Sequence, residues 1–110
     1  MKVNQRDIVE VNFEPPNGKL KVHPTLVLSN ENVLQTEDIF YGVMISSQPY
    51  NDEFTFELTN DMLSSPLRKK FYVKCQLIQS YSEKEVLSKI STMKNSSFQK
   101  VKETIFQTVF

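Results

Sequence analysis

The stretch Val9-Glu10-Val11-Asn12-Phe13 alternates apolar and polar side chains along its whole length. Alternation with a period of two is typical of a β-strand that has one buried and one solvated face. The next residues, Pro15-Pro16-Asn17-Gly18, predict a turn, because proline lacks the donor that a strand ladder needs and Asn-Gly tolerates positive φ. We therefore expect a strand near the N-terminus that ends in a tight connection.

Four further stretches, working outward from this strand, have the composition of strands and are separated by turn residues. Residues 26–28 and 39–45 are mostly apolar, which favours strands covered on both faces. Residues 54–58 and 71–77 alternate, and Leu77 is expected to point inward at the end of the second of them. Five strands with no helix between them predict a mainly β (α+β) fold, built as a small antiparallel barrel or curled sheet.

The last third of the chain changes to a helical period. Ser82 followed by Glu85 matches a capping box, in which each side chain satisfies the other residue's free backbone donor. Apolar residues then recur at helical spacing, and they predict a first short helix. These residues are Val86, Leu87, Ile90 and Met93.

A second capping box, Ser96 with Gln99, opens another run with a helical period. Its apolar side chains fall on one stripe, at Phe98, Val101, Ile105 and Val109. Residues 95–97 are expected to separate the two short helices. Together they form a C-terminal helical element that packs on the sheet.

The length and composition bound the class of protein. A chain of 110 residues predicts a single domain, residues 1–110. No apolar run approaches the roughly 18 residues of a membrane span, and the N-terminal residues lack a secretory signal, so we expect a cytoplasmic protein with no membrane part. The single cysteine, Cys75, cannot form a disulfide within the chain, which is typical of proteins in a reducing compartment. One histidine and one cysteine cannot supply a structural zinc site, and we expect no metal or other cofactor.

The zero net charge hides a segregated pattern along the chain. Residues 31–63 carry seven acidic side chains and no basic one, whereas residues 64–74 carry Arg68, Lys69, Lys70 and Lys74 with no acid. Basic segments that meet in space would form a local anion-binding surface on a neutral protein. The alternative interpretation is that both segments are solvated loops.

His23 is the only histidine and stands before Pro24, at the entry to a strand. Its position favours a functional role, since sites concentrate on loops held by strands, and an imidazole exchanges protons near neutral pH. A structural role stays open. Ser46 and Ser47 place two hydroxyl groups at the end of the next strand, which is either a site or a plain polar strand exit.

Several other kinds of chemistry have no support in the sequence. A G-x-S-x-G elbow is absent, and Gly18 and Gly42 are the only glycines, so neither a serine hydrolase nor a phosphate loop is indicated. Cys75 is expected to be a core residue because it alternates with apolar neighbours. The acids between residues 31 and 61 match no calcium loop and are taken as surface.

Four blocks, in this order, resemble the MazF/PemK toxins of bacterial toxin–antitoxin systems. Residues 5–13 (QRDIVEVNF) are similar to the opening R-G-D-I-V-x-V-x-F of that family, and residues 23–30 (HPTLVLSN) to its R-P-x-L-V-L-S-N block. Residues 45–47 (ISS) are similar to its I-T-S strand end, and residues 72–78 to its S-x-V block. The resemblance covers nearly the whole chain.

The resemblance implies an SH3-like or barrel-like fold, a homodimer, and a metal-independent endoribonuclease that cuts single-stranded RNA and is neutralised by a cognate antitoxin protein. In that reaction the 2′-hydroxyl attacks the adjacent phosphate and leaves a 2′,3′-cyclic phosphate and a 5′-hydroxyl end. By the family's motifs, His23 stands where a catalytic arginine is usual and Ser46 where a threonine is usual. Serine keeps the hydroxyl donor of threonine. Histidine differs more from arginine, because the guanidinium group is always charged and has five N–H donors, whereas the charge of an imidazole depends on pH.

The resemblance also suggests how the remaining roles are shared. His23 is the expected general acid or base, the Ser46 hydroxyl stabilises the developing charge with Ser47 in support, and a cation provides the positive charge that binds phosphate. The candidates for that cation are Arg6, Lys21, Arg68 and Lys69. The candidates for RNA binding are Lys19, Lys21, Gln48, Tyr50, Arg68 and Lys69.

Two other functions stay open on the sequence alone. The histidine at the arginine position and the zero net charge also fit a non-catalytic module that keeps antitoxin or RNA binding. A metal-dependent or serine hydrolase is the remaining alternative. In the RNA-cleaving interpretation, the acidic segment at residues 31–63 is expected to lie away from the RNA path.

Overall fold

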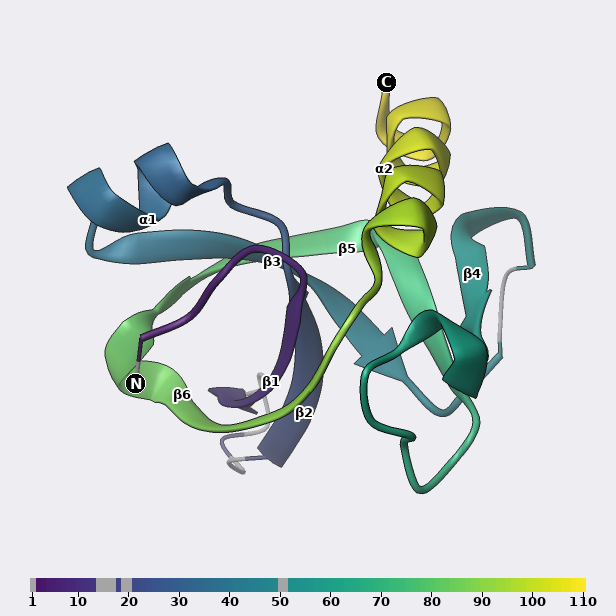
Figure 1. Cartoon of the computed structure of the whole chain (residues 1–110), viewed down its shortest axis with the longest axis horizontal. Coiled ribbons are helices and arrows are strands. Elements are labelled where there is room, and N and C mark those ends of the chain that lie inside the picture. The colour runs from purple at the N-terminus through teal and green to yellow at the C-terminus, as the bar shows by residue number, and fades with distance from the viewer. Residues whose placement is uncertain (1, 14–17, 19–20, 50–51) are drawn as a thin grey trace.

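The structure is a computed structural model that describes residues 2–13, 18, 21–49 and 52–110 (Figure 1). A six-stranded sheet, in which every neighbouring pair is antiparallel, has the order β4-β5-β3-β2-β1-β6. The strands are β1 (Asp7–Phe13), β2 (Lys21–Val27), β3 (Ile39–Ser46), β4 (Thr55–Leu58), β5 (Phe71–Ser82) and β6 (Val86–Thr92). The helices are α1 (Glu31–Thr36) and α2 (Asn95–Val109). The predicted mainly β class is confirmed, with one strand more than expected.

Two hydrophobic cores lie on the two faces of the curled sheet. The first, the α2 core, joins Ile8, Leu26 and Val43 to the buried stripe of α2. The second, the α1 core, contains Val9, Val11, Val27 and Phe40, and Leu34 of α1 packs against it. Because successive side chains of a strand point to opposite faces, β1 contributes Ile8 to one core and Val9 to the other.

The predicted helix over residues 86–93 is wrong, because residues 86–92 form the edge strand β6. The capping box itself exists: the Ser82 amide donates to Glu85 Oε1 (2.8 Å) and Ser82 Oγ accepts from the Lys84 amide (3.2 Å). It caps only the single 3₁₀ turn Glu83–Glu85. Pairing with β1 then overrides the local helical signal, and Leu87 ends up 48% exposed.

The second predicted helix exists, but it begins earlier than the sequence suggested. Its first residue is Asn95, so residues 95–97 form the first turn of α2 instead of a break between two helices. Ser96 is therefore not the N-cap. Phe98, Val101 and Ile105 of the predicted stripe are buried, whereas Val109 is 46% exposed.

A register shift bends the pairing of β5 with β3. Val43 pairs with Ile78, but Ile45 pairs with Val73, so the intervening residues of β5 have no regular partner on β3. The side-chain alternation changes phase across this irregularity. Cys75 is fully buried, as predicted, whereas Leu77 is 39% exposed and the expectation that it points inward is wrong.

Gly42 of β3 allows this strand to approach β2 closely. A Cβ atom at this position would lie 2.6 Å from Thr25 Oγ1 and 3.3 Å from the Leu26 carbonyl oxygen. Thr25 has little freedom to move, because it is fully buried and its hydroxyl donates to the Val43 carbonyl (2.9 Å). The lack of a side chain at residue 42 thus keeps β2 and β3 in register.

We expect Gly42→Ala to destabilise the protein by about 1–3 kcal/mol, the usual cost of overpacking a well-packed interior. Denaturant unfolding measures the change. In a Thr25→Ala background the hydroxyl group that clashes is gone, so the same substitution should cost less. An equal cost of Gly42→Ala in the two backgrounds would contradict this account of the contact.

Candidate functional site

A cavity of about 650 Å³ opens where the α2 core ends. Along β1 and β2 the face that carries Ile8 and Leu26 in this core continues into the cavity as Glu10, Pro24 and Val22. The polar side chains that line the cavity are Glu10, His23, Ser46, Ser47, Gln48, Arg68 and Lys69. The apolar ones are Val22, Pro24, Ile45, Pro66, Leu67, Phe71 and Ile90.

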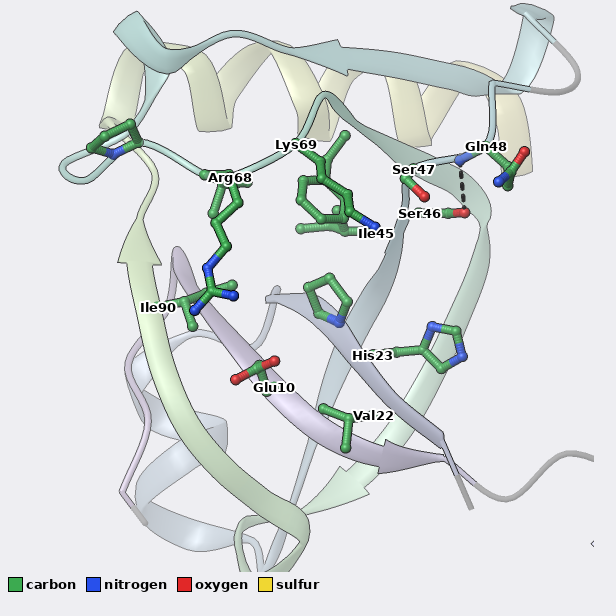
Figure 2. A pocket seen from close by; sticks show the side chains of 14 residues that line it. Glu10, Val22, His23, Ile45, Ser46, Ser47, Gln48, Arg68, Lys69 and Ile90 are labelled. Carbon is green, nitrogen blue, oxygen red and sulfur yellow. Dashed lines mark hydrogen bonds between the residues drawn. The ribbon is translucent and has the colours of Figure 1, made fainter. Parts of the chain in front are cut away.

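His23 lies in β2, opposite Val11 of β1, and its side chain is half-buried. Figure 2 shows the imidazole pointing away from Val22, on the same side of the cavity as Ser46 and Gln48. Burial, and to a lesser extent the charge of Lys21, lowers the pKa of His23 below its usual 6.5. The imidazole is therefore mostly neutral at pH 7, which is the form that accepts a proton.

The pKa of His23 can be measured without ambiguity, because the chain has no other histidine. We expect its ring proton signal in an NMR titration to change with a midpoint below 6.5. Lys21→Gln should raise that midpoint, because it removes a positive charge that disfavours the imidazolium. Lys84→Gln, which removes an exposed lysine elsewhere, is the control and should leave it unchanged. A wild-type midpoint at or above 6.5 would contradict the lowered pKa.

Ser46 and Ser47 reach the cavity because β3 ends at Ser46. The Gln48 amide donates to Ser46 Oγ at 3.1 Å, which fixes the position of that oxygen (Figure 2). The hydroxyl hydrogen stays available to another acceptor, since the oxygen uses only a lone pair in this bond. The strand end thus presents an oriented hydroxyl donor to the cavity that His23 also lines.

Arg68 and Lys69 bring positive charge from the segment between η2 (Asn60–Met62) and β5. Neither side chain forms an ion pair with any residue that the structure describes. Lys70 differs, because its Nζ lies 2.8 Å from Glu57 Oε1, beside a second cavity of about 340 Å³. Arg68 and Lys69 thus line the same cavity as His23 and also border the second cavity, whereas Lys70 is paired with Glu57 and lines only the second.

Two other predicted cations, Arg6 and Lys21, do not line this cavity. Lys21 acts on His23 only through its charge. Arg6 is structural: its Nη1 donates to the Met93 carbonyl (3.0 Å), and its φ of 78° is unusual for a residue with a side chain. Lys19 and Tyr50 lie outside the described residues.

Glu10 is the cavity residue that sequence reasoning missed. Its carboxylate Oε1 accepts a hydrogen bond from the Ser88 hydroxyl at 2.8 Å. The alternation in the sequence did indicate that residue 10 lies on the polar face of β1, but it did not indicate that this face lines a cavity. Among the described residues, Glu10 is the only acid that lines it, so the acids of residues 31–63 stay outside.

Three further features complete the description. Within the described part of the chain, no three His, Cys, Asp or Glu side chains are grouped as a metal site would need. Burial raises the pKa of Cys75 to about 11, so the residue is a core thiol and not a nucleophile. None of the helices in the described segments is long and apolar enough to cross a membrane.

The sequence as a whole identifies the class of protein to which this fold belongs. Residues 4–109 match the family of PemK-like, MazF-like toxins of type II toxin–antitoxin systems. The chain therefore belongs to this family. A comparison with curated protein sequences gives no match.

Solved structures of similar fold agree with this assignment. An endoribonuclease in complex with its cognate antitoxin, from a Mycobacterial species, has a TM-score of 0.81 at 12% identity, over 97% of this chain and 94% of that one. The MazE–MazF complex of Deinococcus radiodurans (Form-III) has a TM-score of 0.79 at 14% identity, over 99% and 97%. The Mycobacterium tuberculosis toxin MazF-mt6 has a TM-score of 0.74 at 17% identity, over 91% and 92%. At these identities the likeness concerns the fold.

Proposed function

We propose that this protein is an endoribonuclease toxin that cleaves single-stranded RNA by transesterification, without a metal ion. Membership of the PemK-like, MazF-like toxin family supports the proposal. The observation that carries it is that an imidazole, two hydroxyls and two cations line one cavity, from His23, Ser46, Ser47, Arg68 and Lys69. A base, a hydroxyl donor and positive charge are the groups that this reaction needs.

Each group has a role in the proposed reaction. Neutral His23 takes the proton of the ribose 2′-hydroxyl, and the 2′ oxygen forms a bond to phosphorus while the bond to the 5′ oxygen breaks. The Ser46 hydroxyl donates to a non-bridging oxygen, where negative charge grows in the transition state. Arg68 binds the phosphate, and Lys69 supplies the proton that the departing 5′ oxygen takes up. The products are a 2′,3′-cyclic phosphate and a 5′-hydroxyl end.

The partners that we propose follow from the family. A cognate antitoxin would bind and neutralise the protein, as the complexes of similar fold suggest. We also propose that the protein acts as a homodimer. Gln48 joins Arg68 and Lys69 as a contact to RNA, because it lines the same cavity beside the serines.

Cleavage can be tested directly with purified protein and a long single-stranded RNA. We expect the same rate with EDTA as with Mg²⁺, and fragments whose new 3′ ends accept a poly(A) tail only after enzymatic removal of the cyclic phosphate. Intact RNA at a large excess of protein over substrate would overturn the proposed function. Cleavage that requires Mg²⁺ would overturn the metal-independent mechanism alone.

A further inference from the structure

Glu10 is a carboxylate in a cavity whose other ionisable side chains are His23, Arg68 and Lys69. A carboxylate repels phosphate, so its place in an RNA-binding cavity calls for a different role. Figure 2 shows it on the side of the cavity away from Ser46 and Ser47, below Arg68. Glu10 therefore lies apart from the serines that the proposed reaction places at the phosphate.

The carboxylate is held in place but retains most of its acceptor capacity. Among the residues that the structure describes, the Ser88 hydroxyl is its only hydrogen-bond partner, and that bond uses one lone pair of Oε1. An ionised carboxylate has about four acceptor sites, so both oxygens can still accept from a ligand. Glu10 thus presents a fixed pair of acceptors to the cavity.

The surroundings of Glu10 suit the flat face of a nucleobase. Pro24 lies directly opposite Glu10 on β2, and Ile90 of β6 lines the same side of the cavity. Leu67 and Phe71 are further apolar side chains of the cavity wall. An apolar wall with one placed polar group is the usual arrangement of a site that discriminates between ligands.

We infer that Glu10 is a specificity-determining residue that binds the Watson–Crick edge of a guanine in the RNA, an inference that rests on the proposed function for its ligand. Guanine presents two adjacent donors on this edge, N1–H and the N2 amino group, which match the two oxygens of a carboxylate. Adenine and cytosine present one amino donor beside an acceptor nitrogen, and uracil presents one N–H between two carbonyls. Each of these three bases would place at least one acceptor atom opposite a carboxylate oxygen, which is unfavourable because neither atom can donate a hydrogen bond.

Binding of 2′-O-methyl oligoribonucleotides tests this inference independently of cleavage, because the blocked 2′ oxygen cannot attack phosphorus. The probes are hexauridylate and its variants with one guanine, adenine, cytosine or inosine at each position. We expect guanine at one position to tighten binding about 10-fold or more over uridine, as a bidentate contact does. Inosine lacks the N2 amino group and should lose most of this gain, whereas 7-deazaguanine, which keeps both donors, should retain it.

Glu10→Gln replaces one of the two acceptors with a donor while keeping the shape of the side chain. A carboxamide offers one acceptor and one donor, which match the amino donor and acceptor nitrogen of adenine and cytosine, so this variant should lose the preference for guanine over these two bases. Glu103→Gln, an exposed residue of α2, is the matched control and should keep the preference of the wild type. Ser88→Ala should weaken the preference without changing its base.

Three results would overturn the inference: equal binding of the guanine and uridine probes, a guanine preference that survives in Glu10→Gln, and no binding of any probe up to about 1 mM, the affinity limit of a very weak complex. The outcome is separable from that of the proposed function. A guanine preference that depends on Glu10, found together with intact RNA in the cleavage assay, would sustain the inference and reject the nuclease.

Discussion

Replacing His23 with alanine is expected to lower the rate of RNA cleavage by about 10²- to 10⁴-fold, the usual contribution of one positioned proton-transfer group. The binding of 2′-O-methyl RNA should change much less, because Arg68 and Lys69 are still present to bind phosphate. Single-turnover cleavage and fluorescence anisotropy measure the two quantities. A cleavage rate within a few-fold of the wild type would remove His23 from the mechanism.

The pH dependence separates a proton-transfer role from a structural one. Only the neutral imidazole accepts a proton, so wild-type cleavage should rise with pH through the pKa of His23, which lies below 6.5. His23→Arg restores the residue usual in the family but removes the group that titrates there. This variant should keep part of the activity of the wild type and lose the rise below pH 6.5. An unchanged pH profile in His23→Arg would show that another group is the base.

The strands were predictable because their signal is local. The alternation of Val9, Glu10 and Val11 and the apolar run of β3 both reflect how a strand divides its side chains between two faces. The helix expected after Ser82 failed for the opposite reason. Its capping box is present, but residues 86–92 are more stable as a strand paired with β1 than as a helix. Because β1 is distant in sequence, the pattern of residues 86–92 does not indicate this pairing.

The site was predictable only in part, for a similar reason. Ser46 ends β3, where polar residues follow an apolar run, and His23 is the only histidine, so both are visible in the sequence, although His23 lies inside β2 and not at its entry. That they share a cavity with Arg68 depends on where the segment before β5 runs, which the local sequence does not indicate. Glu10 was missed because a polar residue that faces a cavity and one that faces bulk water have the same place in an alternating strand.

Removal of Arg68 and Lys69, the two cations that line the cavity, should produce the second large effect. Arg68→Ala combined with Lys69→Ala is expected to weaken the binding of single-stranded RNA by at least about 10-fold near physiological salt. Each cation that neutralises a phosphate releases a counterion bound to the RNA. A plot of the logarithm of the binding constant against the logarithm of the salt concentration therefore has a slope of about −0.7 for each neutralised phosphate of a single strand. The double variant should therefore show a salt slope that is shallower by about 1.4.

The control and the conservative variant make this result specific to the cavity. Lys100→Ala removes an exposed lysine of α2 that does not line the cavity, so it should leave the salt slope unchanged. Arg68→Lys keeps the positive charge but loses the planar guanidinium group that can donate two hydrogen bonds to one phosphate. This variant should therefore retain the salt slope while lowering the affinity for RNA and the rate of cleavage. If the double variant and Lys100→Ala changed the slope equally, the RNA would bind through diffuse surface charge, and Arg68 and Lys69 would lose their assigned role in binding phosphate.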